Sequence, residues 1–227
     1  PDKTYSLGNI VVGGAHVADS YENEFNSLAT NKYAVESIDQ FRPYIDSSPS
    51  KQINLTLDMK MGTMGMSGMS GMDHGSHMMP NGTKMGESGM TATSDDGIEW
   101  EDGSQMMNEM SSTDAVAWKI VDQETQKANE KINWIFKNDE PVKIRIFNDP
   151  NSMHPMQHPI HFHGQRFIVV MRDGVKQTNL VWKDTVLVKT GETVDILLDP
   201  SNPGDWMAHC HISEHLASGM MLNFRVE

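Results

Sequence analysis

Short strand signals recur at close spacing along the C-terminal half of the chain, and they limit its possible folds more than any other feature. Stretches of four to seven apolar or alternating residues are separated by turn-forming segments such as Arg172-Asp173-Gly174. No long amphipathic helical pattern lies between them. The spacing predicts an all-β domain, either a β-sandwich or a Greek-key barrel. We expect its strands at residues 53–59, 115–121, 131–136, 142–147, 166–171, 179–182, 185–189, 193–198 and 222–226.

Composition divides the chain into three parts. Residues 1–50 mix short apolar runs with polar stretches, and the prolines within 41–50 predict an extended linker there. Residues 59–113 are rich in Met, Gly and Ser and poor in aliphatic residues, so they predict a flexible insertion. We therefore expect residues 51–227 to form one β domain that carries this insertion, and residues 1–50 to belong to a preceding unit.

Charge and cysteine content exclude several classes of protein. The chain has 18 Lys and Arg against 31 Asp and Glu, a formal net charge of −13. This balance argues against a nucleic-acid binder, which needs a basic face for the phosphates. Apolar runs are much shorter than the ~20 residues of a membrane-spanning helix. A single cysteine, Cys210, cannot form an internal disulfide.

The histidines are concentrated in two short stretches. Seven of the ten, together with the only cysteine, lie within residues 154–164 and 209–220. Neighbouring side chains on an extended strand point to opposite faces, and side chains two residues apart share a face. His209 and His211 should therefore project together, while Cys210 points the other way. The pattern predicts two ligand sites on opposite faces of one strand pair.

The first predicted site contains Cys210. His158, three residues before His161, falls on the Cys210 side if the backbone is extended. His215 and Met220 follow Cys210 within a single loop. Two imidazoles and a thiolate with a weak axial thioether form the ligand set of a blue-copper electron-transfer centre. Structural zinc is the main competitor, but it favours paired cysteines, and this chain has one. Copper is therefore favoured.

The second predicted site is made only of imidazoles. His161 and His163 project to one face, as do His209 and His211, and that face is opposite Cys210. Four nitrogen ligands could hold one or two copper ions. The paired His-x-His arrangement also has the form of half of a larger cluster.

A family resemblance rests on two strings, HPIHFHG and HCHISEHLASGMM. They resemble the third and fourth copper motifs of the multicopper oxidases, the family of laccases and bacterial copper-efflux oxidases. The likeness continues through residues 144–149 and 182–186. It implies that residues 51–227 form a C-terminal cupredoxin domain, a Greek-key β-sandwich. It also implies that residues 1–50 are the tail of a preceding cupredoxin domain plus a linker.

The resemblance also implies a role for each motif residue. Type 1 copper would be bound by His158, Cys210, His215 and Met220. Type 2 and type 3 copper would be bound by His161 and by His163, His209 and His211, respectively. The implied reaction is one-electron oxidation of a reductant at type 1 copper. Electrons then pass through Cys210 to His209 and His211 and reduce O₂ to water at the trinuclear cluster.

The chain departs from the family pattern in two places. The trinuclear cluster of the family takes half of its eight histidines from N-terminal His-x-His motifs, and this chain has none before His161. We therefore expect N-terminal domains or a second chain of the same oxidase to complete the cluster. Many relatives carry an acidic residue after the last histidine ligand, where this chain has Leu216, so the proton donor stays unassigned. His154 is expected to be a loop residue or a partner of a ligand.

Methionines of the insertion suggest a substrate. Thioethers are soft ligands that prefer Cu(I). Copper-efflux oxidases carry a similar insertion over the approach to type 1 copper, which implies cuprous ion as substrate, phenols as weaker substrates and a role in copper homeostasis. The alternative is a low-complexity linker with incidental methionine. The candidate Cu(I) ligands are Met59, Met61, Met64, Met66, Met69 and Met72.

Two other functions fit part of the pattern. A free-standing blue-copper carrier would relay electrons, but it has no use for His161, His163, His209 and His211. A copper-sequestering protein would use the methionines and leaves the His-Cys-His string without a purpose. The family resemblance further implies a periplasmic or extracellular protein. Residues 1–4 have no signal-peptide pattern, and a processed secreted protein is compatible with that.

Overall fold

The computed structural model describes residues 8–14, 20–28, 32–59, 98, 116–152 and 154–227. Its strands are β1 (Lys51–Met59), β2 (Val116–Asp122), β3 (Asn133–Phe136), β4 (Val142–Asn148), β5 (His158–Phe162), β6 (Arg166–Arg172), β7 (Val175–Lys176), β8 (Trp182–Lys183), β9 (Thr185–Val188), β10 (Thr193–Asp199), β11 (Gly204–Cys210) and β12 (Met221–Val226). Its helices are α1 (Glu22–Leu28), α2 (Lys32–Asp39), η1 (Arg42–Tyr44), η3 (Asn129–Lys131) and α4 (Ser213–Ala217).

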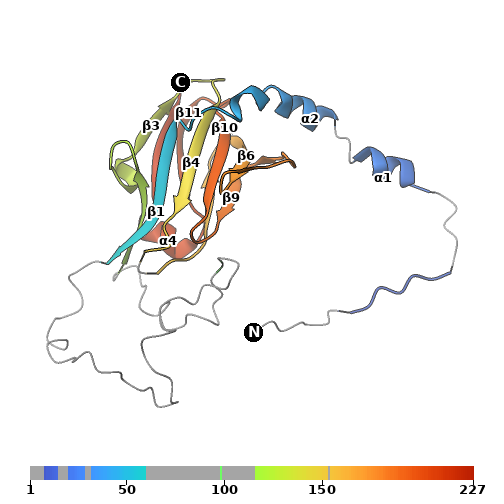
Figure 1. Cartoon of the computed structure of the whole chain (residues 1–227), viewed down its shortest axis with the longest axis horizontal. Helices are drawn as coiled ribbons and strands as arrows, with labels where there is room; N and C mark the ends of the chain where they lie inside the picture. Colours follow the sequence, from blue (N-terminus) through green and yellow to red (C-terminus); the bar gives the residue numbers. More distant parts are fainter. Residues whose placement is uncertain (1–7, 15–19, 29–31, 60–97, 99–115, 153) are drawn as a thin grey trace, which may run out of the picture.

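The strands form two sheets that pack face to face (Figure 1). A seven-stranded sheet has the order β2-β1-β4-β10-β6-β7, with β8 also paired to β6. A five-stranded sheet has the order β3-β12-β11-β5-β9. Both sheets are mixed, because β1 pairs with β4 and β12 pairs with β3 in parallel. The prediction of an all-β cupredoxin-like sandwich is confirmed.

Alternating side chains build the core between the sheets. In β2, Val116, Trp118 and Ile120 are buried and the residues between them are partly exposed, as expected for a strand with one inward face. Strand β10 is different, since nearly all of it is buried. Ile196 faces the central core, while Leu197 faces a second apolar cluster on the outer side of the sheet.

That second cluster is formed by the segment before β1. Ile38 of α2 and Phe41 pack on Ile168 of β6 and Leu197 of β10. The segment before β1 therefore covers the outer face of these two strands. The prediction of an extended linker over residues 41–50 is wrong in its first half, because Arg42–Tyr44 forms a short 3-10 helix. Proline is tolerated in the first helical turn, where its missing N–H has no partner to lose. The predicted domain boundary at residue 50 stays a prediction.

Most predicted strands agree with the structure to within two residues, with two differences. The predicted strand at residues 179–182 is reduced to Trp182–Lys183. The structure also has three strands that were not among those expected: the short β7, and β5 and β11, which carry part of the two ligand-bearing stretches. Of the predicted insertion at residues 59–113, Met59 ends β1 and Ile98 is described. Its other residues lie outside the described part of the chain, as do His16, His74 and His77.

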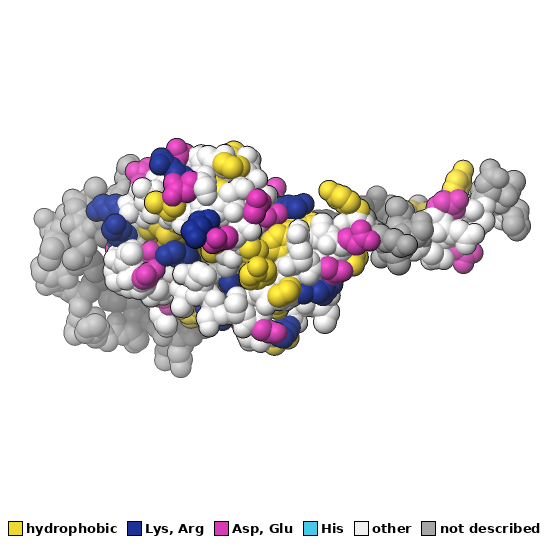
Figure 2. All heavy atoms as spheres, turned by 90° about the horizontal axis from the view of Figure 1, so that it is seen from above, with side chains coloured by type: hydrophobic (Ala, Val, Ile, Leu, Met, Phe, Trp, Pro, Cys, Tyr) yellow, Lys and Arg dark blue, Asp and Glu magenta, His cyan; other side chains and the backbone are white. Residues whose placement is uncertain are grey.

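Surface charge is mixed on the face seen in Figure 2. Acidic and basic side chains are interspersed there, and apolar side chains lie between them. Several exposed charges of the described residues pair, as Arg225 of β12 does with Asp205 of β11. Within the described residues, the helices are all too short and too polar to cross a bilayer.

Candidate metal centre

The pairing of β5 with β11 determines where the motif side chains lie. His209 is directly opposite His161, and Cys210 is directly opposite Ile160. Since successive residues point to opposite faces, His209 and His161 share one face of this sheet, and Cys210 and Ile160 point into the sandwich. The two ligand groups therefore lie on opposite sides of one strand pair.

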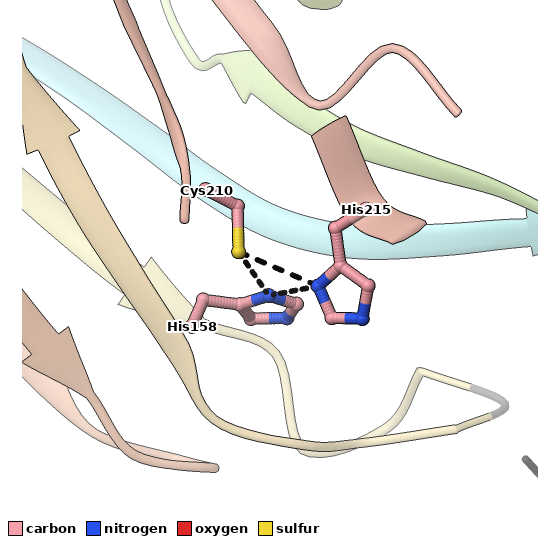
Figure 3. A group of neighbouring side chains, drawn as sticks. All are labelled: His158, Cys210 and His215. Carbon is pink, nitrogen blue, oxygen red and sulfur yellow. Dashed lines mark hydrogen bonds between the residues drawn. The ribbon is translucent and has the colours of Figure 1, made fainter. Parts of the chain in front are cut away.

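Three donor atoms meet on the inner side (Figure 3). The sulfur of Cys210 lies 3.4 Å from Nδ1 of His215 and 3.6 Å from Nδ1 of His158. The two Nδ1 atoms are 3.1 Å apart. All three side chains are buried, with at most 3% of any residue exposed.

The chain reaches this geometry through one strand end and one loop. His158 is the first residue of β5, and Cys210 is the last residue of β11. After Cys210 the chain turns through the short helix α4, which carries His215. The loop closes where the N–H of Met220 donates to the carbonyl of His215 at 3.0 Å and the N–H of Cys210 donates to the carbonyl of Met220 at 3.2 Å.

The distances and protonation states of these groups fit a metal ion. Bonds of about 2.0 to 2.3 Å from imidazole nitrogen and thiolate sulfur to one ion place donors in a plane about 3.5 Å apart. The separations of 3.1, 3.4 and 3.6 Å are of that size. Burial lowers the pKa of His215 to about 3 and that of His158 well below 6.5, so both imidazoles are neutral donors at pH 7.

Burial also shows why the thiolate needs a partner here. It raises the pKa of the Cys210 thiol to about 12, although a backbone hydrogen bond involving Ile212 acts in the opposite direction. A bare thiolate would therefore be unstable in this pocket, and a coordinated metal ion would stabilise it. Met220 is fully buried in the same core and completes the loop that holds His215. The donor set is that of a soft-metal site.

Four imidazoles gather on the other side of the strand pair. The ring centroid of His161 lies 4.6 Å from that of His163, 5.7 Å from that of His209 and 5.8 Å from that of His211. The Nε2 atoms of His163 and His209 are 3.0 Å apart. His209 is buried, His161 and His163 are partly exposed, and His211 is exposed. The cluster therefore opens to the surface.

Backbone carbonyls orient two of these rings. Nδ1 of His209 donates to the carbonyl of Cys210 at 2.8 Å, and Nδ1 of His161 donates to the carbonyl of Asp184 at 3.0 Å. A carbonyl only accepts, so Nδ1 is the donor in each ring, and in the neutral imidazole this tautomer leaves the lone pair on Nε2. Burial and the neighbouring imidazoles lower the pKa of His163. These features suit Nε2 for metal coordination.

An open hollow of about 540 Å³ lies beside this cluster. It is lined by Asn133, His163, Asp205, Trp206, Met207, Asn223 and Phe224. Strand residues of β3, β11 and β12 provide most of this lining. The hollow therefore continues the histidine face along the outer side of the five-stranded sheet.

Two other rings lie near the donors: Trp118, to which the sequence pattern assigns no role, and His154, which is expected to be a loop residue or a partner of a ligand. Trp118 of β2 stacks on the His215 ring, with centroids 3.8 Å apart and planes inclined by 25°. His154 is buried, and its ring centroid lies 6.0 Å from that of Trp118. The alternation of β2 predicts only that Trp118 is buried, because the sequence does not show which side chain it meets. The Cu(I) candidates Met61 to Met72 lie outside the described residues, and the side chain of Met59 is not described.

Comparison with known proteins identifies the family. A family model described as multicopper oxidase matches residues 101–227, more than half of the chain, and the chain belongs to that family. The chain is 36% identical to the multicopper oxidase mco of Staphylococcus aureus over 104 residues, which are 45% of this chain and 21% of that protein. It is 42% identical to Laccase-1 of Fomitopsis schrenkii over 76 residues, which are 32% of this chain and 14% of that protein.

Solved structures with similar sequences include the McoA multicopper oxidase of Aquifex aeolicus. It is 38% identical, covers 46% of this chain and 23% of that one, and has a TM-score of 0.36. The chain thus spans about a fifth or less of the length of the curated relatives compared above. The match lies over the part of the chain that carries both ligand groups, so copper is the metal that family membership implies for them.

Proposed function

We propose that this chain is the C-terminal part of a multicopper oxidase. In this proposal it takes electrons singly from cuprous ion or phenolic reductants and contributes half of the site where O₂ is reduced to water. The observation that carries the proposal is the contrast between adjacent residues. The Cys210 sulfur lies within 3.6 Å of two imidazole donors on one side of the strand, while the rings of His209 and His211 lie on the other.

The proposed type 1 ligands are His158, Cys210 and His215, with Met220 as the axial ligand. Copper, when bound, supplies the one-electron redox chemistry that alternates between Cu(II) and Cu(I). The protein contributes neutral imidazoles, a buried thiol that becomes a thiolate, and a dry surrounding core. Such a core limits solvent access and influences the reduction potential.

The proposed electron path uses covalent bonds of the chain itself. Cys210 is bonded through the backbone to both His209 and His211, and the carbonyl of Cys210 also accepts a hydrogen bond from Nδ1 of His209 at 2.8 Å. A path through Cys210 therefore reaches the second ligand group without crossing a gap. In this proposal Cys210, His209 and His211 are the residues that conduct electrons between the two sites.

The proposed second site is half of a trinuclear copper cluster. His161 would bind type 2 copper, and His163, His209 and His211 would bind type 3 copper. The partial exposure of His161 and His163 and the exposure of His211 support donors from outside this chain. We propose N-terminal domains, or another chain of the same oxidase, as the source of these donors, and a periplasmic or extracellular location.

Substrate preference is proposed from the methionine-rich segment. Met59, Met61, Met64, Met66, Met69 and Met72 are proposed to bind Cu(I) on its way to the type 1 site. Deletion of residues 59–90 should then depress oxidation of Cu(I) more than oxidation of a bulky phenol. An equal loss for both reductants would refute this assignment and the associated role in copper homeostasis.

Copper stoichiometry tests the proposal against its alternative, a free-standing blue-copper carrier. The oxidase should bind one blue copper as an isolated chain and approach four when the partner domains are present, with O₂ consumed only in the second case. A carrier would stay at one copper whatever is added. A protein that only sequesters copper would bind many Cu(I) ions and never turn blue.

A further inference from the structure

Trp118 covers the ligand group on the side of the seven-stranded sheet. Its ring centroid lies 3.8 Å from that of His215 with the planes inclined by 25°, and 5.2 Å from that of His158 with the planes at 71°. One indole therefore lies flat on one imidazole donor and edge-on to the other. Trp118 itself is 2% exposed, so it separates both donors from solvent on this side.

Side chains of two other elements hold the backbone of Trp118 in place. Strand β2 is an edge strand, and the outward N–H and carbonyl of an edge residue need partners outside the sheet. The N–H of Trp118 donates to Oγ of Ser218 at 3.2 Å, and the carbonyl accepts from Nδ2 of Asn129 at 2.9 Å. Oδ1 of Asn129 also accepts from the N–H of Ile120 at 2.8 Å.

Ser218 connects this strand directly to the ligand loop. Its Oγ accepts from Trp118 and donates to the carbonyl of His215 at 3.0 Å. One hydroxyl therefore joins the backbone that carries the indole to the backbone that carries the imidazole. The relative position of the two rings is therefore held by these backbone hydrogen bonds as well as by the contact between the rings.

We propose that Trp118 is a positioning residue for His215. It acts through the imidazole, whose orientation it fixes, and it keeps water away from the donor atoms. The inference deepens the proposed function and rests on it for the copper-loaded state. Its consequence for the copper-free chain, a restrained and shielded His215 ring, depends only on the packing of Trp118, His215 and Ser218.

Removal of the indole has a predictable direction. A smaller side chain frees the His215 ring to rotate and opens space beside the donors for water. Water solvates the more highly charged oxidised site better than the reduced one, so the reduction potential should fall. A stacked phenyl ring should retain part of the effect, because it still covers the imidazole face.

The first test uses the copper-free chain. Trp118→Leu and Trp118→Phe are compared with Trp134→Phe, a matched control because Trp134 is a buried tryptophan of β3 whose Nε1 donates to Asp122 at 3.3 Å. Diethyl pyrocarbonate modification of each histidine is followed by peptide mass spectrometry. His215 should react faster in Trp118→Leu, less so in Trp118→Phe, and at the wild-type rate in Trp134→Phe. Equal rates at His215 in all four proteins would overturn the proposal.

The second test uses the Cu(II)-loaded chain and measures the reduction potential. Trp118→Leu should lower the preference for Cu(I) over Cu(II) at least about tenfold, which is about 59 mV for one electron, and Trp134→Phe should leave it unchanged. An unchanged potential in Trp118→Leu, with all variants blue, would overturn the role of Trp118 and leave the proposed function standing. A wild-type chain that never turns blue would instead overturn the proposed type 1 site. The copper-free test would still decide whether Trp118 positions the ring. Should Trp118→Leu fail to fold, Trp118→Phe carries both measurements.

Discussion

The glycine that ends the first histidine motif is a position where a larger side chain should destabilise the fold. Gly164 follows His163 with φ +67°, and a methyl group there would lie 2.5 Å from three atoms of the Trp206 ring. That ring cannot withdraw freely, because its Nε1 donates to the carbonyl of Asn202 at 2.9 Å. Backbone strain in Gly164→Ala should therefore lower the free energy of unfolding by about 1–2 kcal/mol. Forced repacking adds about 1–3 kcal/mol.

Gly174→Ala separates the two contributions. Gly174 lies in the β6–β7 turn with φ +77° and has nothing within 4 Å of the site of a Cβ atom, so alanine there should cost only the strain. Urea unfolding of the copper-free variants should give a loss about 1–3 kcal/mol larger for Gly164→Ala than for Gly174→Ala. Equal losses would show that the Trp206 contact does not constrain the turn after His163.

Three further predictions concern stability. Lys143, 3% exposed, donates to the carbonyls of residues 45 and 47 at 2.8 and 3.0 Å and pairs with the buried carboxylate of Asp195, which two hydrogen bonds from Arg145 also hold. Lys143→Met should lower the free energy of unfolding by about 1.5–3 kcal/mol, because the two carbonyls lose a charged donor while the carboxylate keeps a partner. The control Lys176→Met, which breaks an exposed pair, should lower it by less than about 1 kcal/mol in urea titrations. Phe41→Ala should lower the free energy of unfolding by about 3–5 kcal/mol if residues 38–45 belong to the same folding unit as the sandwich. Phe25 is exposed, so Phe25→Ala should change it very little. Similar small losses in the two variants would place the domain boundary at residue 50. The copper-free chain should lose stability as pH falls from about 6.5 toward 3. The folded state lowers the pKa of His215 to about 3, so the unfolded chain binds more protons in this window. The midpoint of thermal unfolding should therefore fall with pH, and it should fall less steeply in His215→Gln; an equal dependence on pH in the wild-type chain and the variant would contradict the prediction.

The strand pattern and the two-sided arrangement of the motif residues could be predicted from the sequence. Both depend on the period of two along an extended chain, which is a local property. It places Cys210 and its neighbour His209 on opposite faces without knowledge of any other strand. The four imidazoles come together because β5 pairs with β11 so that His209 lies opposite His161, and this long-range pairing is not a local property of either strand.

Other features depend on contacts that a single strand does not encode. Trp118 precedes His215 by almost a hundred residues, and only the packing of β2 on α4 brings their rings together. The prolines of residues 41–50 predict an extended segment, yet Arg42–Tyr44 is a 3-10 helix beside Phe41, which is buried against the outer face of β6 and β10. Burial of an apolar side chain there outweighs the local preference of the backbone.

Visible absorption of the copper-loaded chain tests the central claim most directly. Cu(II) added to the wild-type chain should produce the intense blue colour of a thiolate–copper site. Cys210→Ser should abolish this colour, whereas Met207→Leu, a change in β11 beside the hollow, should retain it. A wild-type chain that stays colourless, or a Cys210→Ser chain with an unchanged spectrum, would contradict the assignment of Cys210, His158 and His215 as the type 1 ligands.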